Sequence, residues 1–404
     1  MAISRRQFLE VATVGGVTFA LPSLRTGPWL QAAEAASHDE RILVVVQLSG
    51  GNDGLNTIVP FTNDDYFKAR KKIRVAENEV LKLNDELGFH PQMKGLAKLF
   101  EDGKLCVPQG VGYADPNRSH FKSMEIWHTC VRTVEPAEEG WLGKAVASRE
   151  TKSSTSIPSL HLGSTKQPLA LASRSVHTPS VESLNDFRLT MQKSNQQLLR
   201  KLTQQKASEA DSLLDFVEAN TASALDVSAQ LEERLSQTKS TTPFPEFQLS
   251  NKLKTISQLI GAGVGASVYY VELDGFDTHA FQLPAHGALL QELSQSLAAF
   301  QQELTQLGVS DRVLTFCFSE FGRRVEENAS EGTDHGTAAP LFLLGDKVQP
   351  GFHGAHPSLT DLDQGDLKFH TDFRQVYATI LESWLGCDSR QILSGEYKPL
   401  KLIS

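Results

Sequence analysis

The sequence has 404 residues, of which 40% are hydrophobic and 22% are charged. These proportions are normal for a globular protein with a sizeable core, and the length allows two or three domains of ordinary size. The formal net charge of −9 gives no electrostatic reason to expect a nucleic acid or an anionic membrane as a partner.

The first 36 residues have the three parts of an export signal. An Arg5-Arg6 pair stands in the frame S-R-R-x-F-L, an apolar run follows, and a small-residue region holds the A-x-A site Ala33-Glu34-Ala35. The paired arginines resemble a twin-arginine signal. We therefore expect export through the twin-arginine translocase to a periplasmic or extracellular location. The apolar run is shorter than the roughly 20 residues of a bilayer span, so no stable membrane span is expected after cleavage. An uncleaved amphipathic N-terminus is the alternative.

Short β-branched runs alternate with helical patterns along the rest of the chain. The expected strands, all interpreted as buried and parallel, are 42–48, 104–112, 267–273, 312–318 and 340–345. The expected helices are 91–103, 289–308 and 372–386. Continuous apolar runs that alternate with helices are typical of a parallel sheet covered on both faces. The sequence therefore predicts an α/β fold with a doubly wound, mostly parallel sheet sandwiched by helices.

One segment, from about residue 182 to 239, breaks this alternation. It is rich in Gln, Ser, Glu, Lys and Leu and has almost no strand-like run, which predicts one or two amphipathic helices inserted into the α/β body. No heptad is sustained, so a helical cap or an oligomerisation hairpin is favoured over a coiled coil. We expect a signal over residues 1–36 and a single α/β domain over residues 37–404 that carries this helical hairpin.

Polar residues follow the predicted strands. They are Asn52 and Asp53 after the first strand; Asp115, Asn117, Arg118, Ser119 and His120 after the second; Asp274, Asp277 and His279 after the third; Glu320, Arg323 and Arg324 after the fourth; and Asp334 and His335 just before the fifth. Each group alone is explained by turn or capping roles. Because ligands gather at the carboxyl ends of parallel strands, these side chains are expected to converge. Close carboxylates need a balancing charge, and their oxygens together with imidazole nitrogens suit Zn²⁺ or Mn²⁺.

Taken together, several motifs resemble one known family. They are the twin-arginine leader, SGGNDGLNTIVP, YADPNRSHF, GFDTHA, SEFGRR, GTDHGTAAP and TDFRQVYATIL. In this order they resemble an exported bacterial family of unknown function within the alkaline phosphatase and sulfatase-like superfamily. The resemblance implies an alkaline phosphatase-like fold with one or two divalent metal ions, zinc or manganese ahead of calcium or magnesium. It also implies a hydrolase of phosphate or sulfate esters of small molecules, in which a serine or a metal-bound water is the nucleophile.

The resemblance also implies roles for single positions. The implied metal ligands are Asp53, Asp277, His279, Glu320, Asp334 and His335. Ser119 is the implied nucleophile, with Arg118 as an anion clamp. His120, beside Ser119, is either a general base or a capping or packing residue.

One departure from the superfamily pattern weakens a metal position. Glu320 stands where the superfamily usually has an aspartate, and Phe321 stands where it has a histidine. This favours a single-metal site or an oxygen-rich ion. A rival alignment takes Asp334 and His335 as that pair and His353 as the last histidine.

Other features limit the alternatives. The formylglycine motif C/S-x-P-x-R is approached only by CVPQG, which has Gly110 in place of the arginine, and by SIPSL, which ends in Leu160. A formylglycine sulfatase is therefore not expected. Phe321 in a ligand position favours the alternative of a non-catalytic binding or scaffold protein. The four cysteines lack CxxC spacing, which argues against a zinc–thiolate site, and Cys106 and Cys317 are expected to be buried in strands.

Overall fold

The computed structural model describes residues 41–132, 137–149, 158–163, 166–176, 178–181, 240–263 and 266–404. The predicted export signal and helical insert both lie outside these residues. In the part of the chain so described, none of the helices has the length and apolar character needed to cross a bilayer.

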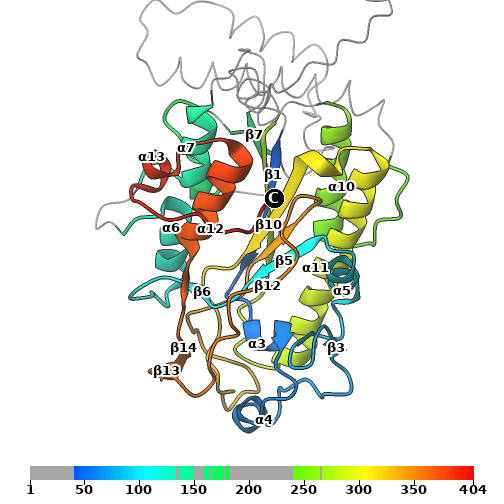
Figure 1. Cartoon of the computed structure of the whole chain (residues 1–404), viewed down its shortest axis with the longest axis vertical. Coiled ribbons are helices and arrows are strands. Elements are labelled where there is room, and N and C mark those ends of the chain that lie inside the picture. The colour runs from blue at the N-terminus through cyan, green and yellow to red at the C-terminus, as the bar shows by residue number, and fades with distance from the viewer. Residues whose placement is uncertain are drawn as a thin grey trace, which may run out of the picture. The chain divides into compact units, whose positions relative to one another are not determined.

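A sheet of eight strands forms the centre of the described part, in the order β12-β5-β11-β10-β1-β9-β7-β8 (Figure 1). Its strands are β1 (Ile42–Ser49), β5 (Leu105–Pro108), β7 (Ser159–Leu162), β8 (Ser180–Val181), β9 (Val268–Asp274), β10 (Val313–Phe318), β11 (Phe342–Leu344) and β12 (Gly351–His353). Strand β1 runs parallel to both of its neighbours, β9 and β10. Its residues are almost all buried, as a strand covered on both faces requires. The predicted α/β class with a mostly parallel sheet is confirmed.

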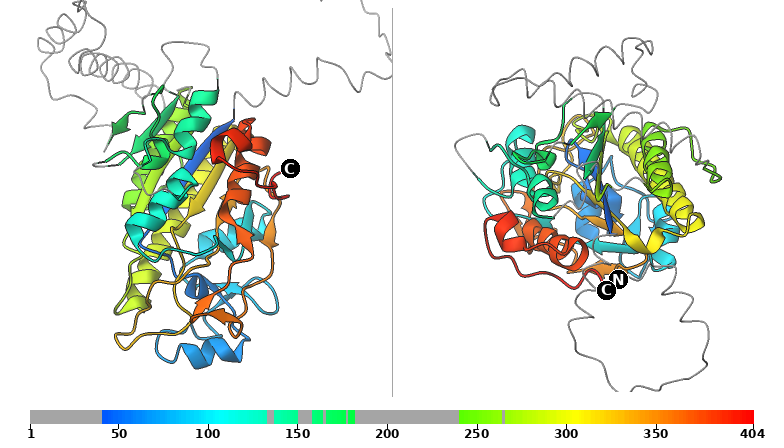
Figure 2. Two further views of the ribbon diagram at one scale, coloured as in Figure 1. Left: turned by 90° about the vertical axis from the view of Figure 1, so that its left-hand side faces the viewer. Right: turned by 90° about the horizontal axis from the view of Figure 1, so that it is seen from above.

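Helices cover both faces of this sheet (Figures 1 and 2). One layer contains α5 (Lys94–Glu101), α10 (Gln248–Gly261) and α11 (Gln282–Gln306), and the other contains α6 (His120–Thr129), α7 (Trp141–Ser148), α12 (Phe373–Thr379) and α13 (Ser389–Leu393). Because side chains alternate along a strand, β1 contributes to both cores. Val44 and Val46 pack with the first layer, whereas Leu43 and Val45 pack with the second.

The fifth predicted strand has the opposite direction to the one expected. Strand β11 pairs antiparallel with both β10 and β5, so the prediction of a parallel strand at 340–345 is wrong. For β11 to run parallel to β10, a crossover connection would have to carry the chain back to the end of the sheet where β10 begins. Residues 319–341 contain no helix, and the chain re-enters the sheet at the edge where β10 ended. The apolar pattern is the same in either direction, so it could not reveal this.

The shorter elements surround the ends of these strands. They are α3 (Gly54–Thr57), β2 (Ile58–Val59), α4 (Asp64–Ala69), β3 (Leu81–Lys82), β4 (Gly88–Phe89), β6 (Val111–Gly112), η1 (Leu169–Leu171), η2 (Ser310–Arg312), β13 (Leu362–Asp363), β14 (Asp366–Leu367), β15 (Thr371–Asp372) and the π-helical η3 (Ile380–Leu385). The predicted strand 104–112 is divided into β5 and β6, because the chain turns at Gly110, whose φ is +55°. Strand β6 then pairs with β15 outside the main sheet.

All four cysteines are free and buried. Cys106 and Cys317 lie on β5 and β10, as predicted. Burial raises the pKa of the Cys106 thiol to about 12 and raises the pKa of the other three thiols above their usual value. These side chains therefore act as small apolar groups.

A buried histidine links α6 to the sheet. His128 Nε2 lies 2.9 Å from Gln47 Oε1 and 3.2 Å from the hydroxyl of Tyr270. Burial lowers the pKa of His128 to about 3. The folded protein therefore keeps this imidazole neutral over a pH range in which the unfolded chain protonates it.

We predict that this histidine makes the protein less stable in acid. Its contribution to the unfolding free energy is fully present above pH 6.5, which is the ordinary pKa of a histidine side chain. That contribution is lost as the pH falls towards about 3. Between about pH 7 and about pH 4.5, this histidine should lower the unfolding free energy by on the order of 2 kcal/mol. In His128→Gln that part of the acid destabilisation should be absent. Urea unfolding at the two pH values measures this loss. His353→Gln, at a partly exposed position of β12, is the control, and a pH dependence that His128→Gln leaves unchanged would contradict the prediction.

Candidate functional site

Two glycines let the chain after β1 pack tightly against neighbouring strand ends. Gly50 and Gly51 have φ values of +116° and +79°. A Cβ atom on Gly50 would lie 2.4 Å from the backbone nitrogen of Asp277, and one on Gly51 would lie 2.4 Å from the ring of Phe321. Only glycine fits both the conformation and the space. The segments after β1, β9 and β10 therefore meet at one edge of the sheet.

The antiparallel return of the chain after β10 adds the last segment. Arg323 and His335 face each other in an isolated antiparallel bridge. Gly322 N–H donates to the Thr337 carbonyl at 2.8 Å, and Gly336 N–H donates to the Gly322 carbonyl at 2.9 Å. The two ends of residues 319–341 are thereby joined, which brings Glu320 and His335 to the same edge.

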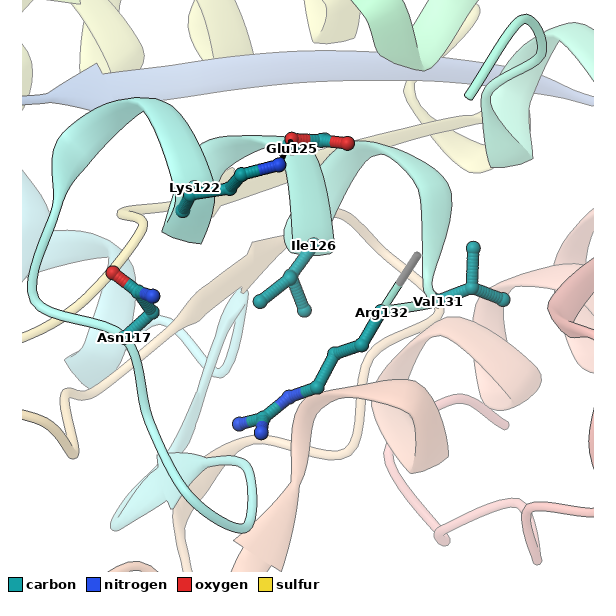
Figure 3. Close-up of a pocket in the computed structure, with 6 residues that line it drawn as sticks. All are labelled: Asn117, Lys122, Glu125, Ile126, Val131 and Arg132. Carbon is teal, nitrogen blue, oxygen red and sulfur yellow. Dashed lines mark hydrogen bonds and ion pairs between the residues drawn. The ribbon is translucent and has the colours of Figure 1, made fainter. Parts of the chain in front are cut away.

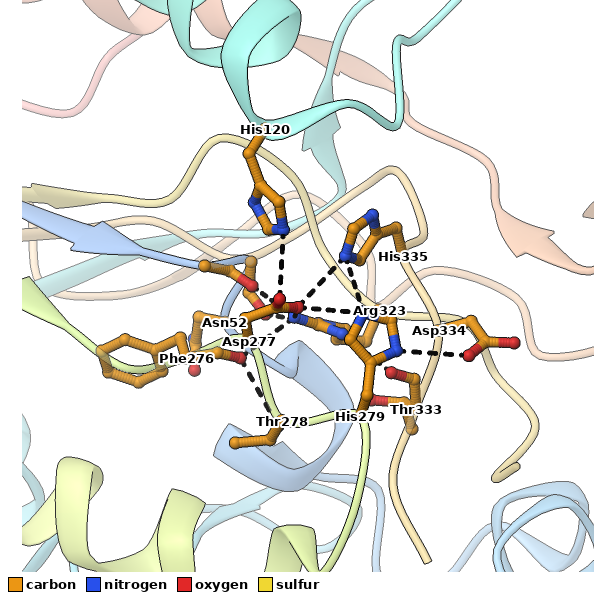
Figure 4. Close-up of polar contacts among 12 residues, drawn as sticks. Asn52, His120, Phe276, Asp277, Thr278, His279, Arg323, Thr333, Asp334 and His335 are labelled. Carbon is orange, nitrogen blue, oxygen red and sulfur yellow. Dashed lines mark hydrogen bonds and ion pairs between the residues drawn. The ribbon is translucent and has the colours of Figure 1, made fainter. Parts of the chain in front are cut away.

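Three imidazoles converge on the carboxylate of Asp277 (Figure 4). Asp277 Oδ1 lies 3.0 Å from His279 Nε2 and 3.1 Å from His335 Nε2, and Asp277 Oδ2 lies 3.5 Å from His120 Nε2. The Nε2 atoms of His279 and His335 are 2.9 Å apart. Ligand atoms of His120, Asp277 and His335 all lie within 4.8 Å of one another. We call these four residues the histidine–aspartate cluster.

Each imidazole is held through its other nitrogen. The Nδ1 partners are Glu320 Oε1 for His120 at 2.8 Å, the Arg118 carbonyl oxygen for His335 at 2.7 Å and Asp334 Oδ1 for His279 at 3.4 Å. All three partners are acceptors, so Nδ1–H donates and Nε2 presents its lone pair to the centre. Oxygen partners of this kind orient metal-binding histidines in proteins.

The charges around the cluster favour a divalent cation. Burial would raise the pKa of Asp277, but the hydrogen bond and the charge of the Arg323 guanidinium hold it at about 2. Burial lowers the pKa of His335, so its imidazole is neutral at neutral pH. Glu320 and Asp334 add two further carboxylates beside the imidazoles, and the buried guanidinium of Arg323 contacts only that of Asp277.

The residues present fit such an ion. The Nε2 atom of His120 is buried and has no hydrogen-bond partner among the described residues. The lone pairs of His279 and His335 face each other across 2.9 Å, which is repulsive unless a proton or a cation lies between them. Imidazole nitrogens with one carboxylate oxygen form a donor set that suits Zn²⁺ or Mn²⁺.

Arg323 is a site residue whose role could not be inferred from sequence. Its side chain is fully buried and donates to the carbonyls of Gly51 and Thr333 at 2.8 Å each. It also donates to Asp277 Oδ1 at 2.6 Å and to the carbonyls of Gly50 and Phe276. One guanidinium therefore ties together the segments that carry the cluster.

Asp53 is placed apart from the cluster. Its carboxylate caps α3, accepting from Leu55 N–H at 3.2 Å, and accepts from both terminal nitrogens of Arg70, with Arg70 NH2 2.9 Å from Oδ1. Both side chains of this ion pair are inaccessible to solvent. Burial would raise the pKa of Asp53, but the Arg70 guanidinium holds it below its usual value. The Arg70 guanidinium thus lies against the carboxylate of this predicted ligand and balances its charge.

The other predicted site residues have mixed placements. Ser119 is the N-cap residue of α6, with an exposed side chain that makes no capping hydrogen bond. The Arg118 side chain contacts the carboxylate of Asp366. His353 bonds to the Gln349 carbonyl at 2.9 Å, away from the cluster, so the structure does not place the rival last histidine with the other imidazoles.

Phe321 lies against the imidazoles. Its ring centroid is 4.9 Å from that of His120 and 4.8 Å from that of His335. The ring is buried and brings no ligand atom to the space beside the cluster.

A separate pocket of about 170 Å³ opens beside α6 (Figure 3). Its lining includes Lys122 and Glu125, which form an ion pair at 2.8 Å, but none of the four residues of the histidine–aspartate cluster. The pocket and the cluster are therefore distinct features.

The fold and the cluster define an α/β protein with a candidate metal site at the ends of its strands. The chain belongs to the family described as "Protein of unknown function (DUF1501)", whose sequence model matches residues 40–398. The predicted membership of a family of unknown function is thereby confirmed. No curated protein matches the chain.

Several solved structures are similar to the chain at low identity. PsFucS1 sulfatase from Pseudoalteromonas sp. has a TM-score of 0.42 and 10% identity, over 92% of this chain and 72% of that one. The lipoteichoic acid synthase LtaP from Listeria monocytogenes has a TM-score of 0.39 and 10% identity, over 88% and 75%. A protein in the alkaline phosphatase superfamily from Vibrio parahaemolyticus has a TM-score of 0.38 and 11% identity, over 89% and 70%. Similarity at this level carries no information about activity.

We predict that Asp53 stabilises the fold and does not bind metal. Asp53→Asn should lower the unfolding free energy by about 3–5 kcal/mol, because it leaves the buried charge of Arg70 without its counterion. Asp65→Asn, which removes an exposed partner of Lys68 on α4, should cost less than about 1 kcal/mol. Urea unfolding measures both changes. A variant of normal stability that has lost affinity for zinc would instead make Asp53 a ligand.

Proposed function

We propose that this protein is a metal-dependent hydrolase of phosphate or sulfate esters that uses one divalent ion. The observation that supports the proposal is the convergence of three Nε2 atoms on Asp277, each imidazole being anchored through Nδ1 to an oxygen. Such an arrangement is costly without a central cation, because it faces lone pairs and carboxylates towards one another.

The cluster would hold the ion through His120, His279, His335 and Asp277. Bound there, the ion would supply electrostatic stabilisation of the negative charge that develops on the ester oxygens. Phe321 favours a single ion, since its ring supplies no ligand where the superfamily pattern has a histidine. Glu320 and Asp334, predicted as ligands, are proposed as positioning residues because each accepts from the Nδ1 of a histidine.

Ser119 is the proposed nucleophile. It stands at the N-terminus of α6, next to His120 of the cluster, where free backbone N–H groups favour a bound anion. His120 is proposed as a metal ligand rather than as the base that activates Ser119. Glu320 holds its Nδ1, its Nε2 faces Asp277, and the Glu320 hydrogen bond raises the pKa of His120.

The protein is further proposed to act in the periplasm or outside the cell. The support is the Arg5-Arg6 pair in its export-signal context. The twin-arginine translocase would then be its export partner.

Metal binding gives the first test. The protein without residues 1–36 should bind about one equivalent of Zn²⁺ or Mn²⁺, and His335→Ala should weaken the affinity by at least about 100-fold, because it removes a direct ligand. His353→Ala changes a histidine outside the cluster and should have no effect. Metal analysis after dialysis and competition with a chelating dye measure both. Equal affinities in the two variants would exclude the cluster as the site.

Turnover gives the second test. The metal-loaded protein should hydrolyse aryl phosphate or aryl sulfate esters, and Ser119→Ala should lower kcat by at least about 1,000-fold. Ser358→Ala, at an exposed site far along the chain, serves as the control. A retained rate in Ser119→Ala rules out this nucleophile. Bound metal with no turnover of either ester would favour the second candidate, a non-catalytic binding or scaffold protein, for which Phe321 beside the cluster is the supporting observation.

A further inference from the structure

Outside the cluster, two arginines contact one buried carboxylate. Asp366 on β14 has a side chain that is only 1% exposed. Arg118 NH2 donates to its Oδ2 atom, and Arg324 Nε lies 3.5 Å from its Oδ1 atom. Each arginine side chain is 37% exposed. Both guanidinium groups thus lie against a buried carboxylate and remain partly exposed to solvent.

Both arginines adjoin the cluster through their backbones. The Arg118 carbonyl accepts from His335 Nδ1 at 2.7 Å, and Arg324 N–H donates to the Asp334 carbonyl at 3.0 Å. The Nδ1 side of the His335 ring faces Arg118, whereas its Nε2 side faces Asp277. The backbone of Arg118 therefore lies on the side of the His335 ring that is turned away from Asp277.

Most donors of the two guanidinium groups have no partner among the described residues. In the part of the chain that the structure describes, the only side-chain hydrogen bond of Arg118 is to Asp366, and Arg324 has its ion pair with the same residue. Asp366 Oδ1 is itself buried without a hydrogen-bond partner. The two guanidinium groups share this one buried carboxylate. The exposed carboxylates nearby are Asp363, opposite Asp366 in its hairpin, and Asp334.

An arginine pair of this kind is suited to bind an oxyanion. A guanidinium presents five donors in a planar fork that matches phosphate, sulfate and carboxylate oxygens. Exposed arginines ordinarily lose side-chain entropy when they bind, but a carboxylate that already orients them reduces that cost. Charge-assisted hydrogen bonds to such an anion are among the stronger ones in proteins.

We propose that Arg118 and Arg324 form a second anion site, which binds an oxyanion of the substrate other than the group that is hydrolysed. The proposal rests on the hydrolase function proposed above and narrows its substrate to esters with at least two negatively charged groups. The second group is a phosphate, a sulfate or a carboxylate, since the three share the oxygen geometry that the guanidinium fork recognises.

Binding of inorganic phosphate to the metal-free protein tests the site without any turnover. In low salt with a chelator, calorimetry should detect phosphate binding, and Arg324→Gln should weaken it by at least about 10-fold. Arg324→Lys keeps the charge but not the planar fork of donors. Its affinity for phosphate should lie between those of the unchanged protein and Arg324→Gln. Lys122→Gln removes a charge from α6 at an exposed position and should bind as the unchanged protein does. No phosphate binding, an equal loss in Lys122→Gln, or a loss only in His335→Ala would overturn the proposal.

Turnover then tests the link to the substrate. The ratio of kcat/KM for 4-carboxyphenyl phosphate to that for phenyl phosphate should fall at least about 10-fold in Arg324→Gln, through KM. A ratio that does not change in the variant contradicts the proposal. If neither ester is hydrolysed, the hydrolase function fails, and the phosphate titration alone decides whether the anion site exists. Thermal unfolding of each variant verifies that it is folded.

Discussion

One buried guanidinium, that of Arg323, holds together the edge of the sheet that carries the histidine–aspartate cluster. The chain leaves the ends of β1, β9 and β10 as irregular segments, whose carbonyl groups need donors once they are buried. Arg323 supplies those donors to four carbonyls, and its charge is balanced by Asp277. A buried cation without a counterion is strongly destabilising. The central acid of the cluster is therefore also a structural residue, so its loss would affect the fold as well as any bound ion.

Two positions that were expected beside a metal ion are occupied differently in the structure. Asp53 is paired with Arg70 inside the protein, and both side chains are inaccessible to solvent. Phe321 places a ring where a nitrogen ligand was expected, next to His120 and His335. Without these two positions, the remaining balance of ligand groups, three imidazoles and one carboxylate, suits one divalent ion rather than two. The proposed single-ion hydrolase follows from this balance.

Local patterns in the sequence predicted five of the eight strands of the main sheet, because a strand buried on both faces must be apolar throughout. The convergence of Asp277 and His279 with Glu320 at one edge followed from the rule that parallel strands end together. His335 joins them only because β11 is antiparallel to β10. The direction of β11 could not be predicted, since an apolar run has the same composition either way. Neither could the partners of Asp53 and Arg118. Arg118 and Asp366 are 248 positions apart, and only the folded chain joins them. The role of His120 depended likewise on Glu320, 200 positions away.

The four cysteines have a consequence for where the protein can mature. Each is a shielded thiol whose deprotonation burial opposes, and none is joined to another. Thiolate is the form that reacts with oxidants and disulfides. The described fold therefore contains no cross-link and keeps its four thiols out of reach of oxidants, so its cysteines need neither a reducing nor an oxidising compartment.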